Sequence, residues 1–215
     1  MQRRNILAHR GMWTKNEEKN SMVALTEALT AGFGVETDFR DLDGMVVISH
    51  DPPGTGQITA ETFFKLYTGL CASGRLALNI KADGLQTLLA ELFSKTEMVL
   101  ENCFTFDMSV PDTLGYFQNG LPAYTRVSEY ETEAILLDRA SGVWVDSFTG
   151  GYPQIAKAHQ LMLEGHRVCI VSPELHKREH RAFWDEIVAV GMHQNPLFEL
   201  CTDFPQEAFD LMGTE

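Results

Sequence analysis

The sequence predicts an α/β fold, a (β/α)₈ TIM barrel that forms one compact domain over residues 1–215. Three observations predict it. Short apolar runs alternate with helical patterns along the whole chain, eight such units can be counted, and polar residues follow the apolar runs. Strands alternating with helices indicate a parallel sheet, and eight βα units favour its closure into a barrel. An open, doubly wound sheet is the structural alternative.

The predicted elements follow in order. Strand-like runs begin at Ile6 and at Gly34, and six more cover residues 76–81, 103–108, 121–127, 143–147, 167–171 and 198–202. The first helix begins near Ser21, which is a suitable N-cap, and ends at Gly32. The later helical patterns cover residues 59–70, 85–92, 111–117, 129–139, 154–164, 180–190 and 207–211.

The first apolar run ends abruptly in His9, Arg10 and Gly11, and the glycine lets the chain turn away. On the second run, Glu36 and Asp38 are two residues apart, so their side chains share one face. Asp43-Gly44 is typical of a hairpin turn, and the β-branched run after it, residues 45–49, delivers His50 back toward that strand. The two histidines are therefore expected to flank the two carboxylates.

Active residues of such barrels lie at the carboxyl ends of the strands. The polar residues that the sequence places there are His9, Arg10, Glu36, Asp38, Asn79, Lys81, Asp107, Arg126, Asp146, Ser172 and Asp203. For Asp107, Asp146 and Asp203, capping of the following helix is an equally good interpretation.

Residue chemistry assigns roles to several of these side chains. Glu36 and Asp38 are two hard oxygen ligands on one face, which a divalent cation such as Mg²⁺ or Ca²⁺ would hold together against their mutual repulsion. His9 and His50 suit general acid and base catalysis, since histidine titrates near neutral pH. Arg10 and Lys81 suit contacts to a phosphate group.

The composition limits the partners. The formal net charge of −13 argues against a nucleic acid or an anionic membrane surface. An anionic substrate would need a local positive centre, which a metal ion with Arg10 and Lys81 would supply. No apolar stretch approaches the roughly 18 residues of a membrane span, and the first strand starts too early to leave room for a signal peptide, so we expect a cytoplasmic protein. The four widely spaced cysteines are expected to be reduced thiols, three of them buried in strands.

Five ordered elements resemble the glycerophosphodiester phosphodiesterase family, within the superfamily of phosphatidylinositol-phospholipase-C-like phosphodiesterases. They are His9-Arg10-Gly11, Asn20-Ser21, Gly34-Val35-Glu36-Thr37-Asp38, Asp43-Gly44 with Val46-Val47-Ile48, and His50-Asp51-Pro52. Weaker similarities continue at Asn79-Ile80-Lys81, Phe106-Asp107 and Thr202-Asp203-Phe204-Pro205. The resemblance implies a barrel that hydrolyses a glycerol-type phosphodiester to a phosphomonoester and an alcohol. It implies His9 and His50 as acid and base, Glu36 and Asp38 as ligands of a divalent metal ion, and Arg10 and Lys81 as phosphate contacts.

One position departs from the family pattern. Asn79 stands where the family has a glutamate that completes the metal site. An amide oxygen can bind Mg²⁺ or Ca²⁺ but adds no charge, so we expect weaker metal binding, a replacement ligand such as Asp107, or loss of activity. The alternative function is therefore a non-catalytic barrel that binds phosphate ligands. A metallo-amidohydrolase would need a His-x-His pair on the first strand, which Ala8-His9-Arg10 does not provide.

The other histidines receive less weight. His176 and His180 are four residues apart and could pair on a helix to bind zinc. They lie in a charged stretch, however, which favours a solvated surface. His159, His166 and His193 are also expected at the surface. Trp144 is expected in the core, and Trp13 beside the mouth of the site. Because the loops after the third and later strands are short, we expect a shallow, open site for a small diester or an exposed group of a larger glycan or lipid-derived molecule.

Overall fold

A computed structural model describes residues 1–214, and the last residue of the predicted domain, Glu215, lies outside the described part. Its strands are β1 (Ile6–His9), β2 (Gly34–Leu42), β3 (Met45–Ile48), β4 (Leu76–Ile80), β5 (Cys103–Phe106), β6 (Tyr124–Val127), β7 (Gly142–Val145), β8 (Val168–Val171) and β9 (Phe198–Thr202). The helices are α1 (Met22–Thr30), α2 (Ala60–Gly69), α3 (Gln86–Lys95), α4 (Val110–Gln118), α5 (Gln154–Leu163), α6 (Arg181–Ala189) and α7 (Pro205–Met212).

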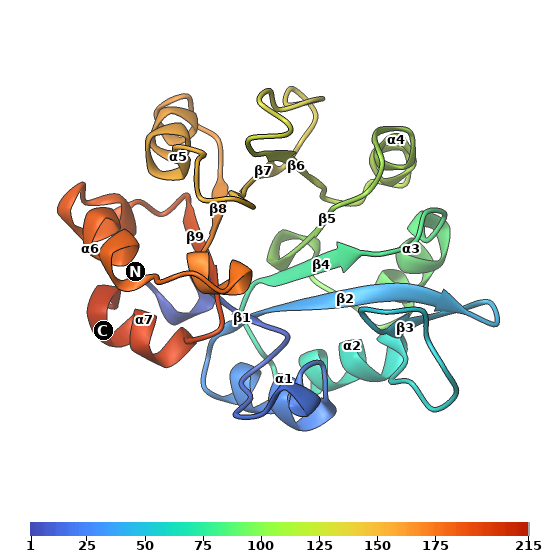
Figure 1. The fold of residues 1–215 in the computed structure, drawn as a ribbon. Helices are drawn as coiled ribbons and strands as arrows, with labels where there is room; N and C mark the ends of the chain where they lie inside the picture. Colours follow the sequence, from blue (N-terminus) through green and yellow to red (C-terminus); the bar gives the residue numbers. More distant parts are fainter. Residues whose placement is uncertain (215) are drawn as a thin grey trace.

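Eight parallel strands form the barrel, in the order β5-β4-β2-β1-β9-β8-β7-β6, and the helices surround it (Figure 1). The strand β3 lies outside this order and pairs antiparallel with β2. The predicted (β/α)₈ fold is therefore confirmed, and the open doubly wound sheet is wrong. No helix within residues 1–214 has the length and apolar character needed to cross a membrane.

The barrel closes between β5 and β6 through a single residue pair. Thr105 bridges Ala123 in parallel, and its backbone N–H donates to the carbonyl oxygen of Pro122 at 2.9 Å. Aromatic rings reinforce this junction from the inside of the barrel. Phe104 of β5 stacks on Tyr124 of β6 with ring centroids 3.6 Å apart, and Phe106 stacks on Trp144 of β7 at 3.9 Å. The two sides of the junction are thus joined mainly by side chains.

Apolar layers fill the space between the sheet and the helices, while a third cluster, which includes Leu7, Phe104 and Cys201, fills the barrel interior. Toward the amino ends of the strands, buried polar groups take over. Glu199 accepts hydrogen bonds from Arg75 Nε at 2.7 Å and from the Tyr124 hydroxyl at 3.0 Å. A buried charge is tolerated there because it is paired and hydrogen-bonded. Arg75, Tyr124 and Glu199 thus form a buried polar cluster at the amino ends of the strands.

The predicted local signals hold for most elements. Ser21 caps α1 by accepting from the backbone N–H of Ala24 at 3.2 Å. Asp43 and Gly44 both have positive φ, as a tight two-residue hairpin turn between twisted strands requires. Cys103, Cys169 and Cys201 are buried and all four cysteines are free, as predicted.

The helix predicted over residues 129–139 is wrong. Residues 128–141 form turns and bends after β6. The Ser128 hydroxyl accepts from the backbone N–H groups of Tyr130 and Glu131, and Leu136 has a φ of 59°. A serine that bonds the backbone locally, together with a left-handed residue, interrupts a helix even where the residues between them favour one.

Candidate active site

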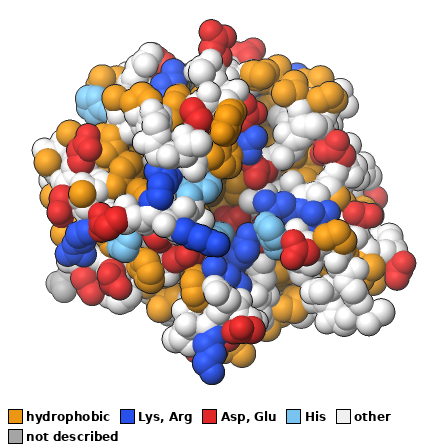
Figure 2. All heavy atoms as spheres, viewed as in Figure 1, with side chains coloured by type: hydrophobic (Ala, Val, Ile, Leu, Met, Phe, Trp, Pro, Cys, Tyr) orange, Lys and Arg blue, Asp and Glu red, His pale blue; other side chains and the backbone are white. Residues whose placement is uncertain are grey.

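A cavity of about 330 Å³ opens at the carboxyl ends of the strands. Its lining includes His9, Arg10, Glu36, His50, Asn79, Lys81, Asp107, Trp144, Asp146 and His176. Figure 2 shows a hollow in this face, with acidic and histidine side chains inside it and lysine and arginine side chains around it. The residues with a role assigned from the sequence all line this cavity except Asp38, which is buried. Among the other polar residues expected at the strand ends, Asp146 lines the cavity, whereas Arg126, Ser172 and Asp203 do not.

The strand pairing explains why these residues meet. His9 is the partner of Glu36 across β1 and β2, and Asp38 is the partner of Asn79 across β2 and β4. Side chains two residues apart on a strand share a face, so Glu36 with Asp38 and Asn79 with Lys81 turn toward the same region. The β2–β3 hairpin then returns the chain, and the N–H of Ser49 donates to the carbonyl oxygen of Asp38 at 3.0 Å. His50 follows directly and lines the cavity as predicted.

His9 is held from two sides. Its Nδ1 lies 2.6 Å from Oδ1 of Asp203, and its Nε2 lies 3.9 Å from Oε2 of Glu36. The backbone carbonyl of His9 accepts a hydrogen bond of 2.9 Å from Trp13 Nε1. An imidazole oriented by a carboxylate on one nitrogen presents the other nitrogen in a fixed direction, which is what a proton-transfer group needs.

A tight turn directs Arg10. Arg10 has a φ of 60° and Gly11 a φ of 88°, and a side chain at Gly11 would stand 2.6 Å from the backbone of Ala24. Only glycine suits that position. The turn leads Arg10 Nε to within 2.8 Å of Oδ2 of Asp38. Within residues 1–214, no side chain bonds the two terminal guanidinium nitrogens of Arg10, so they are available for a ligand.

Asp38 is surrounded by hydrogen-bond donors. Asn20 Nδ2 donates to its Oδ2 at 2.9 Å, and both Arg10 and Lys81 form ion pairs with it, with Lys81 Nζ 3.5 Å from Oδ1. Lys81 Nζ also lies 3.7 Å from Asp107, which in turn pairs with Arg126. The carboxylates of Asp38 and Asp107 therefore pair with three cationic side chains, two of which, Arg10 and Lys81, line the cavity.

Glu36 is buried with fewer polar and charged partners at its carboxylate than Asp38 has. Asn79 Nδ2 donates to its Oε1 at 3.1 Å, whereas Oε2 has no hydrogen-bond partner. Burial, followed by the charge of Asp38, raises the pKa of Glu36, and the nearby positive groups of His9, Arg10 and Lys81 only partly oppose this.

Three buried oxygens fit a hard cation. Oε2 of Glu36, Oδ1 of Asp38 and Oδ1 of Asn79 all lack a hydrogen-bond partner. An orphaned buried oxygen is costly, and a cation that prefers oxygen ligands would satisfy all three. Among residues 1–214, no three His, Cys, Asp or Glu side chains gather as a metal-binding group. The third oxygen of this cluster belongs to the amide of Asn79. The residues present therefore fit a divalent cation with one neutral ligand.

Asp107, Asp146 and Asp203, for which helix capping was an alternative to a role in the site, do not cap helices. Asp107 pairs with Lys81 and Arg126, Asp146 with His176, and Asp203 with His9. The N-cap positions of the helices after them are instead Ser109, Pro153 and Phe204. Trp144 is buried as predicted, and its ring also contributes to the cavity.

The predicted solvated surface around His176 and His180 is wrong. His176 ends the short 3₁₀ helix η4 (Pro173–His176) and lines the cavity, with its Nε2 at 2.7 Å from Oδ1 of Asp146. His180 packs against the rings of Trp184 and Phe204. The sequence did hold a signal: Pro173, two residues after the end of β8, indicates a short turn, which keeps the next residues at the strand end.

Glu174 was also missed. It accepts hydrogen bonds from the Thr202 hydroxyl and, at 3.1 Å, from the N–H of Asp203. It therefore fixes the carboxyl end of β9, where Asp203 holds His9. A glutamate in a charged stretch gives no sign of such a role in the sequence.

No protein-family model and no curated protein sequence matches the chain. Solved structures do. A glycerophosphodiester phosphodiesterase from Parabacteroides distasonis ATCC 8503 is 15% identical with a TM-score of 0.73, covering 97% of this chain and 96% of its own. One from Agrobacterium tumefaciens str. C58 is 16% identical with a TM-score of 0.68, covering all of both chains.

A Ca²⁺-dependent phosphatidylinositol-specific phospholipase C from Streptomyces antibioticus is more distant, with 9% identity and a TM-score of 0.56 over 100% of this chain and 98% of its own. At sequence identities of 9–16%, the similarity to these structures shows a shared fold. The chain has the fold of the glycerophosphodiester phosphodiesterases and, more distantly, of the phosphatidylinositol-specific phospholipases C.

Proposed function

We propose that the protein is a phosphodiesterase that hydrolyses a glycerol-type phosphodiester to a phosphomonoester and an alcohol. The observation that carries the proposal is the pairing of His9 with Asp203 in a cavity that also holds Arg10 and Lys81. An oriented imidazole beside cationic groups suits phosphodiester hydrolysis. The fold shared with glycerophosphodiester phosphodiesterases supports the same reaction class.

Arg10 and Lys81 would bind the phosphoryl oxygens. The free terminal nitrogens of Arg10 can form two parallel hydrogen bonds to a phosphate, while its Nε stays on Asp38. Lys81 lies 3.5 Å and 3.7 Å from its two carboxylates, distances that leave its ammonium able to turn toward an anion. Together they would stabilise charge that develops on the phosphate oxygens.

Glu36, Asp38 and Asn79 would hold a divalent cation, Mg²⁺ or Ca²⁺, through their unpartnered oxygens. When bound, such a cation supplies positive charge to the phosphate and lowers the pKa of a bound hydroxyl. Asp107 is the possible replacement ligand, although Lys81 and Arg126 already pair with it.

His9 and His50 would transfer the protons. One takes a proton from the attacking oxygen, and the other gives a proton to the leaving alkoxide. Asp203 would stabilise the imidazolium form of His9. His50 is half-exposed and pairs through Nδ1 with Asp51 at 2.9 Å, so it would act from the rim of the cavity.

Hydrolysis of glycerophosphoglycerol, glycerophosphocholine and bis(p-nitrophenyl) phosphate tests the proposal, each with Mg²⁺, Ca²⁺ or a chelator. We expect turnover that falls about 10²- to 10⁴-fold in His9→Ala and is lost on chelation. His159→Ala, an exposed histidine on α5, is the matched control and should leave the rate unchanged. Binding of the diesters without any turnover would favour the non-catalytic phosphate-binding barrel instead.

A further inference from the structure

The cavity has two walls of different chemistry. The wall formed by β1, β2 and β4 carries the phosphate and proton-transfer groups described above. The opposite side, which we call the second wall, comprises Phe106, Trp144, Asp146, Phe148, Leu175 and His176. Nothing in the proposed hydrolysis uses the second wall. Its side chains line the same cavity as Arg10 and Lys81.

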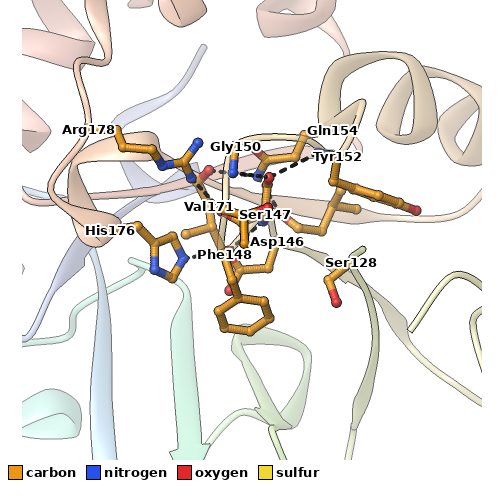
Figure 3. Close-up of polar contacts among 12 residues, drawn as sticks. Ser128, Asp146, Ser147, Phe148, Gly150, Tyr152, Gln154, Val171, His176 and Arg178 are labelled. Atoms are coloured by element: carbon orange, nitrogen blue, oxygen red, sulfur yellow. Dashed lines mark hydrogen bonds and ion pairs between the residues drawn. The ribbon is translucent and has the colours of Figure 1, made fainter. Parts of the chain in front are cut away.

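The polar part of the second wall is a carboxylate–imidazole pair. Oδ1 of Asp146 lies 2.7 Å from Nε2 of His176 and accepts a bond of the same length from the backbone N–H of Ser147. In Figure 3 the ring of His176 points toward Asp146 from the neighbouring strand end. Nε2 of His176 is engaged by this carboxylate, and Nδ1 makes no hydrogen bond within residues 1–214. A carboxylate that orients an imidazole fixes its tautomer.

The surrounding loops hold this pair rigidly (Figure 3). Gln154 Nε2 donates to the carbonyls of Val145 at 3.2 Å and Val171 at 2.9 Å, which ties the ends of β7 and β8 together. Arg178 donates to the carbonyl of Ser147, and the Ser147 hydroxyl accepts from the backbone N–H of Gly150 at 3.1 Å. A polar group fixed in this way selects its ligand by geometry, since it cannot turn to suit another.

The chemistry of the pair favours a neutral hydroxyl as its ligand. A phosphate oxygen would be repelled by Asp146. A quaternary ammonium would need an open aromatic cage or a free carboxylate, whereas Phe106 and Trp144 stack on each other and Asp146 is paired. A hydroxyl group can either donate to Nδ1 of His176 or accept from it, while the carbon atoms that carry the hydroxyl lie against the aromatic rings.

We propose that His176, positioned by Asp146, binds a hydroxyl group on the alcohol portion of the substrate, which is therefore a polyol or sugar alcohol. This rests on the proposed phosphodiester chemistry of the same cavity. It identifies the substrate by the group that the phosphodiester carries, and it makes Asp146 a positioning residue and His176 a specificity-determining one.

The experiment compares the binding of two diesters by calorimetry. Glycerophosphoglycerol carries hydroxyl groups on both alcohols, and diethyl phosphate carries none. The titrations use the His9→Ala background so that no ligand is consumed. His176→Ala is the test variant, and His176→Gln, which keeps a donor for Asp146 and an acceptor for the ligand, reports on folding and rescue.

We expect His176→Ala to weaken glycerophosphoglycerol binding about 10- to 100-fold, the usual range for one buried hydrogen bond to a well-oriented group. Diethyl phosphate binding should change by less than about threefold, and His176→Gln should recover most of the lost affinity. Asp146→Asn should weaken the hydroxylated ligand selectively, though less than His176→Ala does.

Equal weakening of both ligands, no change for either, or no binding of glycerophosphoglycerol in the His9→Ala background would overturn the proposal. These outcomes are separate from failure of the proposed function, which is an absence of turnover with intact His9.

Discussion

Nδ1 of His9 and Oδ1 of Asp203 are 2.6 Å apart, so the end of the first barrel strand is bonded to the end of the last. The two residues are separated by 194 positions in the chain. In Asp203→Asn, an amide replaces the carboxylate that orients the imidazole of His9. We expect kcat on bis(p-nitrophenyl) phosphate to fall about 10²-fold or more, measured by steady-state kinetics. Asp210→Asn, on the exposed face of α7, is the control. An unchanged kcat in Asp203→Asn would remove this pair from the mechanism.

The variant Asn79→Glu tests whether the buried oxygens of Glu36, Asp38 and residue 79 bind a divalent cation. Asn79 now donates to Glu36 across β2 and β4, and a glutamate there would replace that hydrogen bond by repulsion between carboxylates. We expect a lower melting temperature than wild type in chelator and a higher one in Mg²⁺ or Ca²⁺, with cation binding at least about tenfold tighter by calorimetry. Asn79→Gln, which stays neutral, should not tighten binding. Unaltered cation affinity in Asn79→Glu would argue against a metal at these oxygens.

Gly11→Ala should destabilise the protein more than Gly44→Ala does. Both glycines have positive φ, so an alanine costs about 1 kcal/mol at either position. At Gly11 the added Cβ also meets the backbone of Ala24 at 2.6 Å, whereas nothing lies within 4 Å at Gly44. Urea unfolding gives the comparison, with an excess loss of about 1–3 kcal/mol expected for Gly11→Ala. Equal losses for the two variants would mean that the Ala24 backbone moves freely.

The contribution of Glu129 to stability should depend on pH. Burial by itself raises the pKa of Glu129, but hydrogen bonds from Thr149 and Phe148 outweigh it and lower the pKa from 4.5 to about 2. Because the folded-state pKa is the lower one, the ionised carboxylate stabilises the protein above pH 4.5, and this contribution is lost as the pH falls toward 2.

Urea unfolding of Glu129→Gln at pH 7 and at pH 3 measures this contribution. The wild type should exceed the variant in unfolding free energy at pH 7 by more than it does at pH 3. The exposed Glu133→Gln serves as the control and should show no such pH dependence of the difference. A constant difference between wild type and Glu129→Gln would contradict the assignment.

Local patterns predicted most of the fold because the decisive interactions there are local. Ser21 caps α1, Asp43 and Gly44 form the hairpin turn, and alternation along β2 turns Glu36 and Asp38 to one side. The segment after β6 escaped prediction for the opposite reason. Its residues favour a helix, but Glu129 and Glu131 bond to Thr149 and Arg126 instead, and tertiary contacts of this kind override propensity.

The site could be predicted more fully on one wall of the cavity than on the other, where Asp146 was expected at a strand end but His176 was not expected in the site. His9, Glu36 and Asn79 are adjacent through strand pairing, which the order of the strands implies. His176 reaches the cavity through a single 3₁₀ turn, and Glu174 acts through a partner on another strand. Such placements depend on how a loop folds back, and a run of charged residues looks the same whether it faces solvent or a cavity.

Stacked aromatic rings pack across the junction between β5 and β6, where the backbones are joined by one bridge at Thr105. A hydrogen-bonded ladder fixes the spacing of two strands, whereas stacked rings allow the spacing to follow ring size. Trp144 belongs both to these stacked rings and to the second wall of the cavity. Replacing Phe106 or Trp144 by a side chain of another size would therefore change both the width of the barrel and the fit of the substrate. Variants that accept a substrate of different size should first be sought at these positions.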